Sequence, residues 1–187
     1  MPRMQGTTEQ LALWTRIAAF DLDAVDAELP FSARLARDNG WSRAYAVRAI
    51  EEYKRFVFLA MAAGHPVTPS DEVDQVWHLH LCYTRSYWED LCGEVLRAPL
   101  HHGPTRGGAA ERARFDDQYR RTLASYEVFF EEPPSVAWWP SPVERFARRR
   151  WRRVDLGARR TVPRSGVLAA AAAAPAAPQH ERGDKQD

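Results

Sequence analysis

The sequence predicts an all-α protein. Apolar residues recur every three or four positions along several stretches, no stretch alternates with a period of two, and glycine and proline separate the segments. With 187 residues and 45% hydrophobic content, the chain is long enough for one domain with a substantial core. We therefore expect a single compact bundle of about four to five helices, followed by a disordered C-terminal tail.

The first two predicted helices each carry an apolar stripe. Residues 8–22 bring Leu11, Trp14 and Ile17 onto one side of a helix. Residues 42–63 form the longest apolar pattern in the chain, as a central helix needs, and Gly64 is a natural C-terminal stop. The apolar face of this second helix comprises Tyr45, Ala49, Ile50, Tyr53, Phe56, Val57 and Ala60.

A third helix is predicted from the segment TPSD to about Cys92. Thr68 is the expected N-cap, Pro69 the first helical residue and Asp71 the acidic partner of a capping box. Gly93 follows the expected end of the helix. We therefore expect one continuous helix of about six turns.

The C-terminal half predicts two more helices and a tail, and with them the domain organisation. Residues 109–131 carry aromatic side chains at helical spacing, and a shorter helix is expected over about 142–154. We expect a helical domain over residues 1–141 and an Arg-rich amphipathic helix within 142–162, packed on it or flanking it. The Ala/Pro-rich residues 163–187 lack a core-forming pattern and are expected to be disordered.

The charge pattern points to one candidate surface for an acidic partner. The net charge is only +1, so no global basic signal for nucleic acid exists, but residues 141–164 hold nine arginines and two acidic residues. This segment could bind an acidic protein, an anionic lipid surface or nucleic acid, or it could only keep the protein in solution. Its polar face comprises Arg145, Arg148, Arg149, Arg152 and Arg153.

The segment DEVDQVWHLHLC holds two histidines that must face opposite sides of a helix, because neighbours two positions apart differ by about 200°. His80 lies on the apolar side, where a neutral buried histidine bonded to a tyrosine or a carbonyl is expected. His78 shares the polar side with Asp74, one turn earlier. This pair could be two metal ligands, a carboxylate orienting an imidazole, or part of a solvated charged face.

The loop after this helix adds a second pair, His101 and His102, between two prolines in PLHHGP. If the loop folds back along the helix, these histidines converge with Asp74 and His78. Imidazole and carboxylate donors suit a divalent transition metal, with Zn or Fe as the expected ions. The alternative is a histidine pair that caps helix ends.

These residues also carry a resemblance to a known family. The segments VDQVWHLHLCYTRSYWEDLC and PLHHGP resemble the signature of the glycine-rich domain-containing protein-like family, and flanking segments resemble its bacterial members. The resemblance implies a helical domain with a shared site around the W-H-x-H helix, but no reaction. It adds Trp77, His80 and Tyr87 to the candidate binding residues. The short alanine-rich tail departs from the glycine-rich tails of plant members.

Two classes of function remain open on the sequence. The first is a metal- or small-ligand-binding domain with Arg85 as a candidate anion contact, which, if catalytic, suggests metal-assisted hydrolysis or metal-dependent oxidation. The second is a non-enzymatic interaction module whose histidines are structural. Two cysteines too far apart to pair along one helix and the lack of a membrane-spanning segment predict a cytoplasmic protein.

Overall fold

The computed structural model describes residues 4–23, 27–103 and 107–147. Within these residues the chain forms helices and no strand, which confirms the all-α prediction. The helices are α1 (Thr8–Ala19), α2 (Phe31–Asn39), α3 (Arg43–Ala62), α4 (Asp71–Cys82), the π-helix η1 (Ser86–Leu96), α5 (Ala109–Phe130) and α6 (Pro142–Ala147). None of the described helices is long and apolar enough to cross a bilayer.

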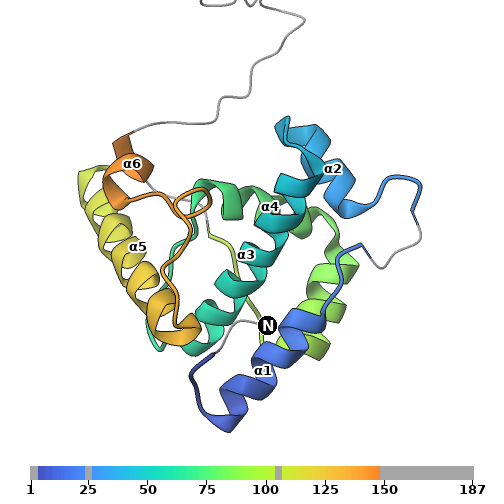
Figure 1. Cartoon of the computed structure of the whole chain (residues 1–187), viewed down its shortest axis with the longest axis horizontal. Helices are drawn as coiled ribbons and strands as arrows, with labels where there is room; N and C mark the ends of the chain where they lie inside the picture. The colour runs from blue at the N-terminus through green and yellow to red at the C-terminus, as the bar shows by residue number, and fades with distance from the viewer. Residues whose placement is uncertain (1–3, 24–26, 104–106, 148–187) are drawn as a thin grey trace, which may run out of the picture. The chain divides into compact units, whose positions relative to one another are not determined.

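Helix α3 is the central element, as its apolar pattern predicted. It packs against α1, α2, α4 and α5, and Figure 1 shows it running through the middle of this arrangement. Its end also follows the sequence, because Gly64 adopts a positive φ of 69° just beyond the last helical turn. The core around it is rich in aromatic rings, with Phe56, Phe58 and Tyr53 fully buried.

A buried carboxylate links α3 to the C-terminal half of the domain. Glu52 is only 1% exposed, and its Oε2 accepts hydrogen bonds from Tyr126 Oη and Trp139 Nε1, each at 3.0 Å. The guanidinium of Arg55 lies 3.9 Å from the other carboxylate oxygen. These partners compensate the cost of burying the charge and hold α5 and the segment after it against α3.

Two differences from the expected helices matter for the site. The sequence interpretation assigned no helix to the stretch that forms α2, in which Phe31 and Leu35 are buried against the core. The helix expected to continue to Cys92 instead breaks at Tyr83, whose backbone is non-helical (φ −92°, ψ 65°), and the chain resumes as η1. The described residues therefore form more helices than expected, and the long helix predicted up to Cys92 is divided into α4 and η1.

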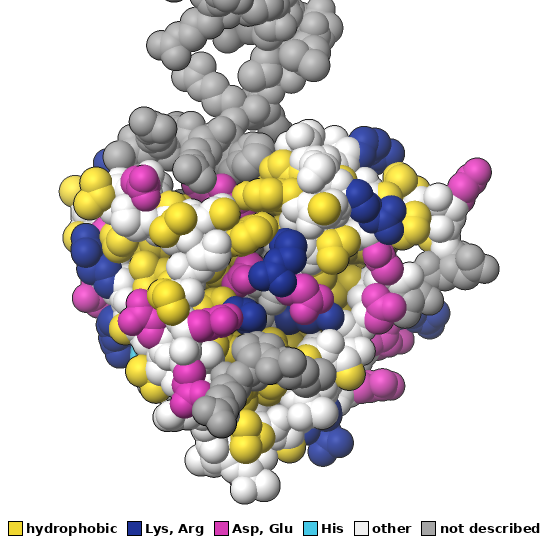
Figure 2. Space-filling view, in the orientation of Figure 1, with side chains coloured by type: hydrophobic (Ala, Val, Ile, Leu, Met, Phe, Trp, Pro, Cys, Tyr) yellow, Lys and Arg dark blue, Asp and Glu magenta, His cyan; other side chains and the backbone are white. Residues whose placement is uncertain are grey.

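The expected Arg-rich helix is described only over its first residues, as α6, and its remainder lies outside the described residues. The tail over residues 163–187 also lies outside them. On the face drawn in Figure 2, acidic and basic side chains of the described residues are mixed with apolar ones and do not form a patch of one sign.

Candidate functional site

Helix α4 brings Asp74 and His78 onto one face. Its N-cap is Ser70, whose hydroxyl accepts a hydrogen bond from the backbone N–H of Val73 at 3.2 Å. The expectation that Thr68 caps this helix is therefore wrong. The backbone N–H of Thr68 instead donates to the hydroxyl of Thr122 on α5 at 3.0 Å, which holds this residue outside the helix.

The spacing of one turn between Asp74 and His78 produces the contact that the sequence predicted. Asp74 Oδ2 lies 3.7 Å from His78 Nε2. The Asp74 side chain is 26% exposed and that of His78 is 49% exposed, so both are open to a ligand.

The loop after η1 folds back toward the start of α4. Arg97 takes a left-handed conformation (φ 57°), and the N–H of Ala98 returns to the carbonyl of Cys92 at 3.1 Å, which reverses the chain. Buried Tyr87 then fixes the loop: its hydroxyl accepts a hydrogen bond from Trp77 Nε1 at 2.9 Å and donates one to the carbonyl of Leu100 at 2.5 Å. Trp77 and Tyr87 thus position the loop that carries the histidine pair.

His102 completes a three-residue cluster. Its Nε2 lies 3.0 Å from Asp74 Oδ1, its ring stands edge-on to Trp77 with centroids 4.5 Å apart, and its centroid is 4.6 Å from that of His78. One donor atom from each of Asp74, His78 and His102 lies within 4.8 Å of the others. We call these three residues the His/Asp cluster. The loop has closed onto the helix as the sequence interpretation required.

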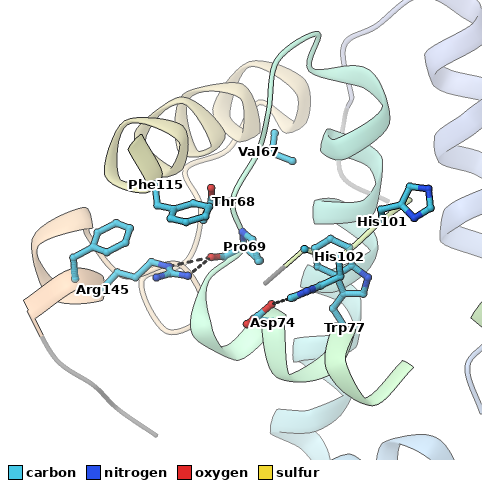
Figure 3. Close-up of a pocket in the computed structure, with 11 residues that line it drawn as sticks. Val67, Thr68, Pro69, Asp74, Trp77, His101, His102, Phe115 and Arg145 are labelled. Carbon is cyan, nitrogen blue, oxygen red and sulfur yellow. Dashed lines mark hydrogen bonds and ion pairs between the residues drawn. The ribbon is translucent and has the colours of Figure 1, made fainter. Parts of the chain in front are cut away.

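His101 and Arg85 do not join this cluster. Figure 3 shows His102 pointing toward Asp74 while the His101 ring points away, and the His101 ring lies against Trp88 with centroids 5.6 Å apart. Neighbours in an extended loop point in opposite directions, so only one of two adjacent histidines reaches the helix. Arg85 has a side chain that is 84% exposed and pairs with Glu89 at 3.2 Å. The structure does not bring Arg85 to the site.

His80 faces the core, opposite His78, as the helical geometry predicted. It is fully buried, with Nδ1 3.0 Å from the hydroxyl of Tyr53 and Nε2 3.2 Å from that of Ser86. Burial lowers the pKa of His80 from 6.5 to about 4, because the charged imidazolium loses its hydration. His80 is therefore a neutral structural residue with no access to a ligand.

A cavity of about 300 Å³ opens beside the His/Asp cluster. It lies between the start of α4, the returning loop, α5 and α6, as Figure 3 shows. Its walls combine apolar and polar side chains: Val67, Thr68, Pro69, Asp74, Trp77, His101, His102, Gly103, Phe115, Arg145 and Phe146.

Arg145 occupies this cavity wall instead of a solvent-facing cationic surface. Its side chain is 14% exposed, it donates two hydrogen bonds to the carbonyl of Pro69 at 2.7 and 3.0 Å, and it lies 3.3 Å from Asp71 Oδ1. Its guanidinium also stacks near the rings of Tyr119 and Phe146. Arg145, which the sequence assigned to the polar face of this segment, instead packs against Tyr119 of α5, as Phe146 does.

The sequence interpretation missed Phe115, Arg145 and Phe146 as cavity residues. These residues lie on α5 and α6, far from the His/Asp cluster in the sequence. Spacing within one segment cannot predict that α5 and α6 close over the start of α4. The one available signal was the aromatic pair at Phe115 and Phe146, which could equally have been core.

Fold and site define a class: an all-helical domain with a His/Asp cluster at the mouth of a small cavity. The chain is similar to glycine-rich domain-containing protein 1 of Arabidopsis thaliana, with 23% identity over 133 residues, and to glycine-rich domain-containing protein 2 of the same plant, with 24% over 112. These matches cover 68% and 57% of this chain but only 16% and 14% of the relatives.

The chain thus spans about a sixth of the length of the curated relatives it matches. Their names support the family resemblance that the motif indicated, and neither name states a ligand or a reaction. Both are plant proteins, so the resemblance to bacterial members stays a prediction. No family model matches the chain. No solved structure matches it either.

Proposed function

We propose that the His/Asp cluster binds a divalent transition metal ion, zinc or ferrous iron, through Asp74, His78 and His102. The observation that carries the proposal is the approach of three donor atoms to within 4.8 Å of one another. Two imidazoles and one carboxylate with further positions open are a donor set used by non-haem iron and by catalytic zinc.

The distances support a shared ion after a movement of the His78 side chain. Two ligands with bonds of about 2.1 Å to one ion lie about 3.0 to 4.2 Å apart, depending on the angle at the metal. The distances of His102 Nε2 from Asp74 Oδ1, 3.0 Å, and of His78 Nε2 from Asp74 Oδ2, 3.7 Å, fall in this range, each through a different carboxylate oxygen. At the facial or tetrahedral angles of such a site the ligand atoms lie about 3.0 to 3.4 Å apart, so a separation of up to 4.8 Å within the cluster must close by about 1.4 Å, and His78 is exposed enough to move.

The surroundings of the ligands also suit a metal. The Trp77 ring packs against His102, and the Trp77–Tyr87–Leu100 hydrogen bonds hold the loop, so little conformational entropy is lost when an ion binds. Three protein ligands leave at least one coordination position open beside the cavity. We therefore propose that the domain binds a small ligand at this position. If it is an enzyme, metal-assisted hydrolysis and metal-dependent oxidation are the two candidate reactions.

The competing proposal is a metal-free module in which the same contacts are structural. The hydrogen bond between His102 and Asp74 would then only tie the loop to α4. Both proposals predict a loss of stability when Asp74 or His102 is replaced, so stability alone does not separate them. Metal affinity does.

The test uses full-length protein produced without a histidine tag. Isothermal titration with Zn²⁺ should give one ion per chain, and His78→Ala, Asp74→Asn and His102→Ala should each weaken binding by about 10-fold or more. His101→Ala is the matched control, because it removes the adjacent imidazole that points away from the cluster. Binding below one tenth of an ion per chain, or an equal loss in His101→Ala, would overturn the proposal.

A further inference from the structure

Beyond the cluster itself, the cavity beside it has a composition that selects a ligand. We infer that the metal-loaded protein binds a small organic carboxylate, with the carboxylate at the open metal position and an apolar body against the aromatic wall. This inference rests on the proposed metal site and names the class of ligand that the site takes.

The walls of the cavity identify the apolar part of the ligand. Val67, Pro69, Trp77, Phe115 and Phe146 supply apolar surface, and a volume of about 300 Å³ suits a ligand the size of one substituted ring. Inorganic phosphate would leave this surface in contact with water. An apolar body is therefore expected to strengthen binding through buried area.

The charges of the cavity identify the polar part. Among the described residues that line it, Asp74 and Arg145 are the charged side chains, and Arg145 is already paired with Asp71. Without a metal, the carboxylates of Asp71 and Asp74 outweigh the one guanidinium, and an anion is repelled. A bound divalent cation reverses the sign, so the site then attracts one negative charge.

Arg145 is the residue that assists this anion from the protein side. A guanidinium has five N–H donors, and the contacts to Pro69 and Asp71 use three of them, so two have no partner among the described residues. Its place among Tyr119 and Phe146 fixes it at the cavity wall. It acts as a positioning and charge-supplying residue and is not itself a metal ligand.

The experiment measures how the binding of the carboxylate and the binding of the metal affect each other. Because the carboxylate and the metal bind at one site, each must raise the affinity of the other by the same factor. The probes are benzoate, neutral benzyl alcohol and inorganic phosphate, each titrated into full-length protein loaded with Co²⁺ and into the metal-free protein. The visible spectrum of Co²⁺ reports whether the anion enters the coordination sphere.

The expected result is saturable benzoate binding with a change in the Co²⁺ spectrum, weakened about 10-fold or more without metal. Benzyl alcohol and phosphate should bind about 10-fold more weakly than benzoate. Arg145→Gln should lower benzoate affinity about five-fold and leave Co²⁺ affinity unchanged, whereas Arg37→Gln on α2, also an ion-paired arginine, should change neither.

A second variant tests the same inference independently, in case Arg145→Gln does not fold. Phe115→Ala, on the half-buried face of α5, should weaken benzoate but leave acetate unchanged, because acetate has no ring to lose contact. Protein that binds Co²⁺ but gives no saturable benzoate response, or binds phosphate as tightly as benzoate, overturns this inference and leaves the metal proposal standing. Protein that takes up no Co²⁺ overturns the metal proposal first.

Discussion

At the scale of single residues, two histidines two positions apart in α4 have opposite roles. His80 is fully buried and held by Tyr53 and Ser86, whereas the side chain of His78 is 49% exposed. Two positions along a helix correspond to a turn of about 200°, which places the two rings on opposite faces. The structure identifies the hydrogen-bond partners of His80, which the sequence could not.

Replacement of each histidine by alanine should therefore have unequal effects on stability. His80→Ala should lower the free energy of unfolding by about 2 kcal/mol or more, because it leaves a cavity and unpaired hydroxyl groups. His78→Ala in the metal-free protein should cost about 0.5 kcal/mol or less, as for most exposed sites. Urea denaturation of both variants measures this, and the reverse order would contradict the assignment.

The buried imidazole of His80 should also make the domain sensitive to mild acid. Its pKa is lowered from 6.5 to about 4, so below about pH 6.5 the unfolded chain takes up a proton that the folded chain refuses. The stability conferred by the neutral imidazole is complete above pH 6.5. It is lost as the pH falls toward 4, by up to about 3 kcal/mol.

The check is the free energy of unfolding measured at several pH values for the metal-free wild type and for His80→Gln. The glutamine amide can form hydrogen bonds with the same hydroxyls but does not titrate. The free energy of unfolding should therefore fall less between pH 6.5 and pH 4 in this variant than in the wild type. A variant with the same acid dependence as the wild type would show that His80 is not the group responsible.

At the scale of elements, the site depends on a loop that returns along its own helix. The Tyr87 hydroxyl is the link, since it joins Trp77 on α4 to the carbonyl of Leu100. We expect Tyr87→Phe to lower stability by about 1 to 3 kcal/mol and to weaken Zn²⁺ binding about 10-fold, because His102 loses its support.

A matched control for that change is Tyr45→Phe. The Tyr45 hydroxyl also donates to a backbone carbonyl, that of Ala137 at 3.2 Å, but outside the residues that line the cavity. Zn²⁺ affinity should be unchanged in this variant. Equal Zn²⁺ affinity in Tyr87→Phe and the wild type would remove Tyr87 from the account of the site.

The Arg-rich segment after α6 gives the other prediction at this scale. With Arg145 held in the cavity wall, we propose that binding of a polyanion falls to Arg148, Arg149, Arg152 and Arg153. Truncation after Ala147 should abolish retention on heparin and leave the thermal melt unchanged, because Arg145 and Phe146 keep their contacts with α5. Full-length protein that passes a heparin column at low salt would contradict this.

At the scale of the whole molecule, the sequence predicted the features that depend on interactions between residues close together in the chain. The class of fold, the central helix α3, the stop at Gly64 and the facing of His78 and His80 all follow from periodicity and from chain-reversal chemistry. The break in the helix at Tyr83 does not, because no glycine or proline marks it. At the break, Tyr83 packs against Phe31 and Arg34 of α2, a contact with another helix that the local sequence does not indicate.

Helix α2 was missed although it carries a signal. Phe31 and Leu35 are one turn apart and Gly40 ends the helix with a φ of 67°, but only two strong apolar positions stand in nine residues. Three of the four proposed ligands, Asp74, His78 and His102, come together in the His/Asp cluster, and the His101 ring lies outside it. The cavity could not be predicted, since it forms only where α5 and α6 close over α4.

X-ray absorption at the zinc edge determines whether Asp74, His78 and His102 hold one metal ion. Full-length protein loaded with one Zn²⁺ per chain should show two imidazoles and light oxygen donors at about 2.0 to 2.2 Å, with one imidazole lost in His102→Ala. Cys82 is a free, exposed thiol one turn beyond His78. A sulfur shell at about 2.3 Å, or an unchanged spectrum in His102→Ala, would show that these three residues do not hold the ion.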